Sequence, residues 1–136
     1  MIGQAGIGKS RLAWEFLKYI DGVTEIVHWH QGRSPAYGEG ISFWALGEMV
    51  RMRIGIGEGS DEETTRRQLT ESLAEHVADA DERRTLTEPL LHLLGVGESS
   101  AHDRGRLFAA WRTFFERIAE QGPVVMVFED LQWADD

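Results

Sequence analysis

The sequence predicts an α/β fold in which helices flank a parallel sheet, and three observations support this class. A glycine-rich segment, GQAGIGKS at residues 3–10, leads directly into a helical pattern. Five consecutive apolar residues at 124–128 are typical of a strand buried on both faces, as in parallel sheets. Between these ends, residues 42–121 repeat apolar positions at helical spacing. Together they predict one domain with a helical middle.

Composition excludes several classes of function. The 136-residue chain has 14 basic and 23 acidic side chains and a net charge of −9, so direct contact with nucleic acid is not expected. Cysteine is absent, which excludes disulfides and thiolate metal sites. No apolar run approaches the roughly 20 residues that span a bilayer, and the start shows no signal-peptide pattern. We expect a cytoplasmic protein without membrane contact.

The segment GQAGIGKS matches the pattern GxxxxGK[ST] of a phosphate-binding P-loop. Gly3, Gly6 and Gly8 let the backbone curl inward where a Cβ would block phosphates, and the helix that follows offers unpaired N–H groups. Lys9 is placed to reach the β- and γ-phosphates, and the Ser10 hydroxyl to bind Mg²⁺. The alternative is a plain glycine-rich turn. The predicted nucleotide-binding residues are Gly3, Gln4, Ala5, Gly6, Ile7, Gly8, Lys9, Ser10 and Arg11.

The next two elements are a helix and a strand. Apolar residues share one helical face and end before Gly22, a stop signal; they are Leu12, Ala13, Phe16, Leu17 and Ile20. A strand with Val23, Ile26, Val27 and Trp29 then runs into a predicted turn at residues 32–35. His28 and His30 share one face of that strand. A metal pair is conceivable, but no third ligand is evident nearby, so packed or surface histidines are favoured.

Capping signals divide the middle of the chain into helices. Ser42 is predicted to cap the first of them, with Arg51 and Arg53 on its solvated edge. Ser60 and Glu63 form a capping-box pattern for the second helix. Thr87 is predicted to cap a third helix that has Pro89 in its first turn and ends at Gly95. The last helix carries an apolar stripe and stops before Gly122; its residues are Leu107, Phe108, Trp111, Phe114, Phe115 and Ile118.

The apolar strand at 124–128 ends on Glu129 and Asp130, in the Walker B pattern. Carboxylates at the carboxyl end of such a strand lie where ligands bind in open α/β sheets. One acid can hold the water shell of Mg²⁺ and the other can polarise the attacking water. Position makes Glu129 the metal-side acid and Asp130 the water-side acid, the reverse of the usual order, so the division of roles stays open. A solvated acidic loop is the alternative. The predicted catalytic residues are Lys9, Glu129 and Asp130, and the predicted metal ligands are Ser10, Glu129 and Asp130.

Three segments carry a family resemblance: GQAGIGKSRL near the start, YGEGISFWAL at residues 37–46 and VFEDLQWADD near the end. With them the chain resembles the AAA-type ATPase domain of the signal-transduction (STAND) NTPases, and in particular the origin-recognition-like module of bacterial regulators with cyclase or LuxR-type domains. The resemblance implies ATP and Mg²⁺ as ligands, a loop near the nucleotide at residues 33–41, and effector and sensor domains on the same polypeptide. The preference for adenine rests on this resemblance alone.

Only Met1 and Ile2 precede Gly3, although a P-loop is normally fed by a strand. We therefore expect residues 1–136 to be the first portion of a three-layer P-loop ATPase domain, with its first strand and its later strands missing. The expected parts are a Walker A segment at 3–10, a helical middle at 42–121 and a Walker B segment at 124–130. Such a piece alone is expected to bind nucleotide poorly and to be inactive.

The function predicted for the whole protein is ATP binding with Mg²⁺ and slow hydrolysis as the nucleotide switch of a larger regulator. Two alternatives stay open. A P-loop small-molecule kinase needs an acceptor pocket and usually a basic lid, and this acidic chain shows no evident one. A non-catalytic scaffold module would hold ATP only as a structural ligand.

Overall fold

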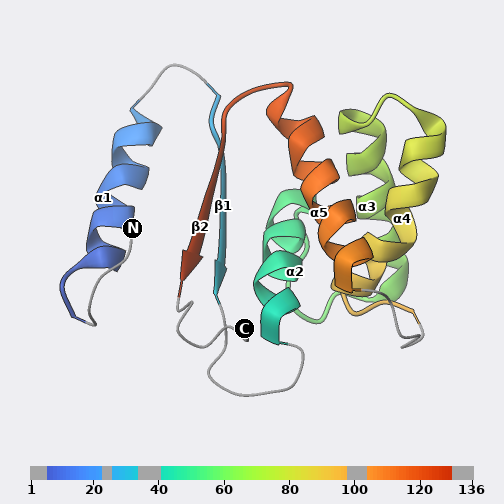
Figure 1. Ribbon diagram of the computed structural model, residues 1–136, viewed down its shortest axis with the longest axis horizontal. Helices are drawn as coiled ribbons and strands as arrows, with labels where there is room; N and C mark the ends of the chain where they lie inside the picture. Colours follow the sequence, from blue (N-terminus) through green and yellow to red (C-terminus); the bar gives the residue numbers. More distant parts are fainter. Residues whose placement is uncertain (1–5, 23–25, 34–40, 98–103, 130–136) are drawn as a thin grey trace.

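The computed structural model describes residues 6–22, 26–33, 41–97 and 104–129. Within these residues the chain forms five helices and two strands (Figure 1). This mixture is compatible with an incomplete α/β fold, whereas the complete three-layer P-loop arrangement stays a prediction. The elements are α1 (Lys9–Asp21), β1 (His28–Arg33), α2 (Ile41–Ile54), α3 (Glu62–His76), α4 (Ala80–Leu93), α5 (Arg104–Ala119) and β2 (Val124–Glu129).

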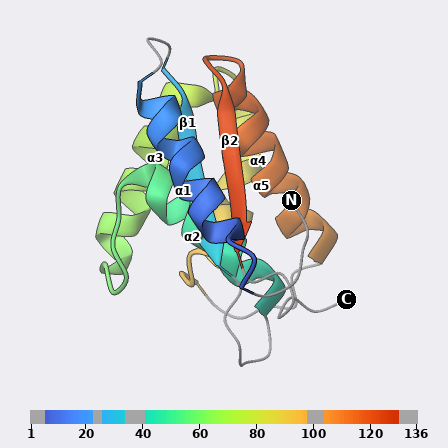
Figure 2. The same ribbon diagram turned by 90° about the vertical axis from the view of Figure 1, so that its left-hand side faces the viewer.

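The two strands pair in parallel, from His28 opposite Val124 to Arg33 opposite Glu129, which confirms the predicted parallel pairing. Helix α1 lies over one face of this strand pair, and the remaining helices lie on the other side (Figures 1 and 2). Because side chains alternate along a strand, each strand contributes to both sides. The rings of Trp29 and Phe16 of α1 are 6.3 Å apart between centroids.

The main core lies between α2, α3, α4 and α5, with β2 packed against its edge. The predicted stripe of α5 is confirmed apart from Phe108, which is 49% exposed. Strand β2 is half-buried rather than buried on both faces: Val124 and Met126 pack against this core, and the partly exposed Phe128 ring contacts Trp111. No described helix combines the length and apolar character needed to cross a membrane.

Three predicted helix starts are wrong, and in two cases an aspartate explains why. Asp61 caps α3, its carboxylate accepting from the Thr64 N–H at 2.8 Å, while the Ser60 hydroxyl donates to the Gly57 carbonyl. Asp79 caps α4, so Thr87 does not. The aspartates accept from the exposed first-turn N–H groups that would otherwise lack partners.

Two further boundary predictions differ in detail. Helix α2 already includes Ile41, so Ser42 lies inside it and is not its cap. Pro89 lies inside α4, not in its first turn, and the helix continues past the missing N–H. The predicted end of α4 is confirmed, since Gly95 follows the cap residue Leu94 with φ of +79°. A positive φ is the conformation that glycine adopts without a steric penalty.

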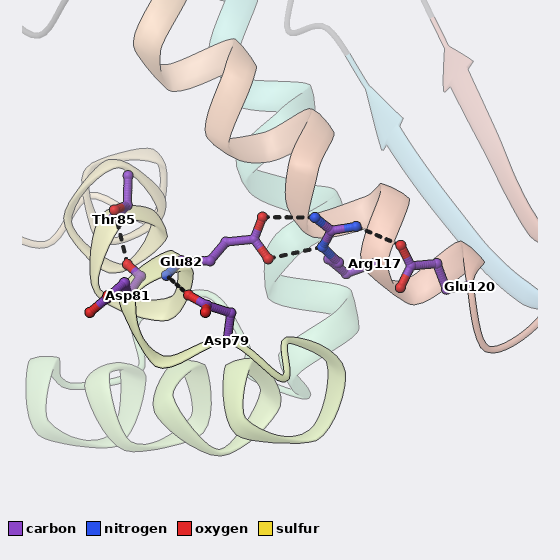
Figure 3. A network of polar contacts seen from close by, with 6 residues as sticks. All are labelled: Asp79, Asp81, Glu82, Thr85, Arg117 and Glu120. Carbon is purple, nitrogen blue, oxygen red and sulfur yellow. Dashed lines mark hydrogen bonds and ion pairs between the residues drawn. The ribbon is translucent and has the colours of Figure 1, made fainter.

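Helices α4 and α5 are joined by a charged contact (Figure 3). The Nε and Nη2 groups of Arg117 on α5 each donate to the Glu82 carboxylate at the start of α4, both at 2.9 Å. Its Nη1 donates to Glu120 at 2.5 Å. The hydrogen bonds from Arg117 hold the pKa of the Glu82 carboxyl below its usual value. This bidentate ion pair holds the end of α5 against the start of α4.

Gly32 does not begin a turn, as the sequence predicted, but lies within β1 opposite Phe128. A Cβ built on Gly32 would sit 2.4 Å from the carbonyl oxygen of Ala45 in α2. A Cβ on Gly47 would likewise sit 2.5 Å from the carbonyl oxygen of Leu93. Glycine therefore allows α2 to press against both β1 and the end of α4.

Replacing Gly32 with alanine tests this close approach. We expect Gly32→Ala to lower the free energy of unfolding by about 1–3 kcal/mol, because the main chain of β1 or α2 must shift to admit the methyl group. Gly57→Ala is the matched control, since Gly57 is exposed and an added Cβ meets no atom within 4 Å. Urea denaturation measures both. Equal stability of the two variants would contradict the close contact.

Candidate functional site

The amino end of α1 is formed by two glycines in a left-handed conformation. Gly6 has φ of +81°, and Gly8, the residue before the helix, has φ of +89°. The Gly8 carbonyl accepts the first helical hydrogen bond, from the Leu12 N–H at 2.9 Å. Both glycines thus occupy positions that other residues adopt only with strain. The predicted residues Gly3, Gln4 and Ala5 lie outside the described part of the chain.

The electrostatics at the start of α1 differ from those at the starts of α3 and α4. Those two helices each begin with a capping aspartate and two acids in the first turn. Helix α1 has no side-chain cap and no acid in its first turn, which instead holds Lys9 and Arg11. Ser10 and Arg11 are exposed, and Lys9 is half-buried. The positive end of the helix dipole therefore adds to two basic side chains, an arrangement that attracts an anion.

The carboxyl ends of both strands lie at the same end of the molecule as the start of α1 (Figures 1 and 2). Glu129 is the last residue of β2 and is half-buried. Its Oε2 accepts from Gln31 Nε2 at 2.7 Å and from Arg33 Nη2 at 3.1 Å. Asp130, the other predicted acid, lies outside the described residues.

Alternation along β1 shows which face Glu129 occupies. Trp29 contacts Phe16 on the α1 side, so Gln31 and Arg33, two and four residues later, face the same side. Glu129 pairs in register with Arg33 and bonds to both of these side chains, so it lies on that face too. The structure therefore brings Glu129 to the face of the strands that α1 covers.

Gln31, Arg33 and Glu48 are site residues that sequence reasoning missed. The Arg33 main-chain N–H donates to Glu48 Oε2 at 2.8 Å, which fixes the end of β1 to α2. Polar residues at alternate positions, Gln31 and Arg33, were the available signal, but the turn predicted at Gly32 separated them. A cavity of about 410 Å³ opens beside them, lined by Gln31, Arg33, Glu48, Arg51, Met52, Ile56, Glu58 and Glu129.

A second cavity, of about 550 Å³, lies between the α2–α3 connection and the end of α4. Its lining includes Arg51, Ser60 and Gly95 but none of the predicted nucleotide or metal residues. Arg51 Nη2 donates to the Leu94 carbonyl at 3.0 Å within this region. The cavity beside Glu129 therefore contains one predicted site residue, and no described residue of α1 lines either cavity.

The two histidines of β1 have packing partners. His30 is buried, and its ring lies 4.8 Å from the ring of Phe115 between centroids. His28 Nδ1 is 3.0 Å from Arg53 Nη1, so the prediction that Arg53 lies on a solvated edge is wrong. Among the described residues, no group of three or more histidine, aspartate or glutamate side chains could hold a metal ion.

Fold and site together are compatible with an incomplete α/β fold in which the start of α1, without a side-chain cap, lies at the same end of the molecule as the carboxyl ends of a parallel strand pair. The family model described as "AAA ATPase domain" matches residues 1–136, and the chain belongs to this family. Searches of curated proteins and of solved structures found no match. The predicted AAA-type ATPase relationship is confirmed, and membership suggests nucleotide binding and ATPase activity.

Proposed function

We propose that the protein binds ATP together with Mg²⁺ at the edge formed by the start of α1 and the end of β2. The observation that carries this proposal is the coincidence of the GxxxxGK[ST] pattern with a helix start that has no side-chain cap, at the end of the molecule where β2 also ends. Membership of the AAA ATPase domain family supports it independently. A P-loop contacts phosphates and does not distinguish between bases. The proposed preference for adenine therefore rests on the family relationship.

The phosphate-binding role falls to the glycine-rich segment 3–8 and the first turn of α1. Main-chain N–H groups and the dipole at the start of α1 favour binding of a polyanion. At the starts of α3 and α4 an aspartate side chain takes the corresponding position. Lys9 supplies a point charge for the β- and γ-phosphates. Arg11 and Ile7, both exposed, border the same turn.

The metal-binding role falls to the Ser10 hydroxyl and to the acids at 129 and 130. Both donors to Glu129 bond to Oε2, which leaves Oε1 unbonded within the described residues and open to Mg²⁺ or one of its waters. Gln31 and Arg33 act as positioning residues that keep the carboxylate on the α1 face. When bound, Mg²⁺ neutralises charge on the phosphate oxygens.

Hydrolysis in this proposal is slow and serves as a switch. Asp130 or Glu129 polarises the attacking water. Bound ATP stabilises one arrangement of the linked domains, and loss of the γ-phosphate releases it. The switch acts within a larger cytoplasmic regulator of the STAND type, whose effector and sensor domains lie on the same polypeptide. The low stability expected of α1, which has no buried residue, suits an element ordered by its ligand.

Removal of the Lys9 ammonium group tests phosphate binding. We expect Lys9→Ala to weaken binding of a fluorescent ATP analogue by about 10–100-fold, the effect of losing a charge-assisted hydrogen bond. Lys18→Ala is the matched control, because Lys18 is the only other lysine, lies in the same helix and packs over the Trp14 ring. Equal affinity of the two variants would remove the P-loop assignment.

Neutralising Glu129 tests metal binding separately. In the wild type we expect Mg²⁺ to strengthen ATP binding relative to buffer with a chelator. Glu129→Gln should lose most of this strengthening and keep its metal-free affinity, because only the metal contact needs the negative charge. Glu58→Gln is the control, since Glu58 is exposed and lines the same cavity. An unchanged response to Mg²⁺ in Glu129→Gln would exclude Glu129 from the metal site.

A further inference from the structure

A polar cluster joins four segments at the start of the strands, the end opposite the proposed nucleotide site. Its centre is Arg53, near the end of α2, and we call it the Arg53 cluster; its members are His28, His30, Arg53, His76 and Gln121. Arg53 Nη1 lies 3.0 Å from His28 Nδ1 and Nη2 lies 2.7 Å from His76 Nε2. His76 Nδ1 lies 2.7 Å from Gln121 Oε1, in the turn between α5 and β2.

Hydrogen-bond chemistry fixes the direction of each bond. A guanidinium group only donates, so His28 Nδ1 and His76 Nε2 must both accept and neither can carry a proton. The ring proton of His76 is then on Nδ1 and is donated to Gln121 Oε1. Gln121 Nε2 donates in turn to the Glu75 carbonyl at 3.2 Å. This chain of bonds is complete only while both imidazoles are neutral.

The surroundings oppose a second positive charge. His76 is 5% exposed and His30 is 2% exposed. Burial, followed by the nearby Arg53 charge, lowers the pKa of His28 and lowers that of His30 to about 4. Glu75 is the one carboxylate near the cluster among the described residues; its side chain is 69% exposed, with Oε2 3.7 Å from His76 Nε2. With neutral imidazoles the cluster therefore holds one positive charge, that of Arg53, and an exposed carboxylate, Glu75, beside it.

Two buried atoms of the cluster have no hydrogen-bond partner in the described part of the chain. Arg53 Nε and His30 Nδ1 are both buried without a hydrogen bond within the described residues. Such groups carry the free-energy cost of lost hydration, so the cluster is maintained only by the remaining bonds and the packing around it. Loss of either Arg53 bond to a histidine would leave a further buried donor unpaired.

We propose that the Arg53 cluster is a proton-operated latch: with neutral His28 and His76 it fastens the start of β1 to the ends of α2 and α3 and to the turn before β2, and proton uptake by either imidazole opens it. The proton taken up occupies the nitrogen that accepts from Arg53, so two donors then face each other. This inference concerns conformation at the far end of the strands and does not depend on nucleotide binding.

The sign of the pH effect follows from the lowered pKa values. A histidine whose pKa is lower in the folded than in the unfolded state gives stability that is complete above the unfolded value, about 6.5. For His28 this stability is lost as pH falls below the unfolded value toward its lowered pKa in the folded state. Each such imidazole changes the folding equilibrium by up to about tenfold per pH unit in this interval.

Variants that accept hydrogen bonds but do not titrate test the latch. In His28→Asn and His76→Gln the amide oxygen replaces Nδ1 and Nε2, respectively, as acceptor for Arg53. Between pH 7 and pH 5 we expect the folding equilibrium constant of the double variant to fall less steeply than that of the wild type, by up to about tenfold per pH unit for the loss of the His28 imidazole, as measured by urea denaturation. His92→Gln, in α4 outside the cluster, is the control and should match the wild type. Equal pH dependence of double variant and wild type would overturn the proposal.

A measurement on the wild type covers the case in which the double variant fails to fold. We expect amide hydrogen exchange, corrected for its intrinsic pH dependence, to lose protection first at residues 28–30, 74–77 and 121–125 as pH falls from 7 to 5.5. Protection in α4 and α5, whose contact runs through Arg117 and the core, should fall later. Simultaneous loss of protection in all these segments would show that no separate latch exists.

Discussion

The parallel pairing of β1 with β2 is the constraint on which the rest of the arrangement depends. It brings both carboxyl ends to the edge where α1 begins and separates α1 from the other helices. The pleat then places Gln31, Arg33 and Glu129 on the α1 face, while Gly32 contacts α2 on the other. A slip of one residue in β2 would turn Glu129 to the opposite face of the strand pair and break its contacts with Gln31 and Arg33, so the proposed site depends on this register.

Stability is divided unevenly between the two sides of the strand pair. Helices α3, α4 and α5 each have at least five buried residues, and the Arg117–Glu82 contact joins α4 to α5. Helix α1 contributes none, and Leu12 and Phe16 of its predicted apolar face are 58% and 48% exposed. A ligand at the start of α1 would therefore stabilise the helix with the least buried surface. The Arg53 cluster instead joins the start of β1 to α2 and α3, on the more stable side of the strand pair.

Sequence reasoning succeeded where one strong local pattern determined the structure. The glycines before α1, the aromatic stripe of α5 and the apolar strand β2 all follow from spacing and composition. It failed where two local signals competed. Asp61 lies next to Ser60 and took the cap of α3, and Asp79 started α4 a full two turns before Thr87. The Gln31–Arg33–Glu129 contacts and the Arg53 cluster join segments far apart in the sequence, and no local pattern encodes such contacts.

The central claim is that the start of α1 and the end of β2 form one site for a Mg²⁺-bound triphosphate. Amide chemical shifts recorded by NMR during titration with Mg²⁺ and a non-hydrolysable ATP analogue test it most directly. We predict that the largest shifts occur at Gly6, Gly8, Lys9 and Ser10, with a second group at Phe128 and Glu129. Shifts confined to the cavity between Arg51 and Gly95, with the start of α1 unaffected, would contradict the account.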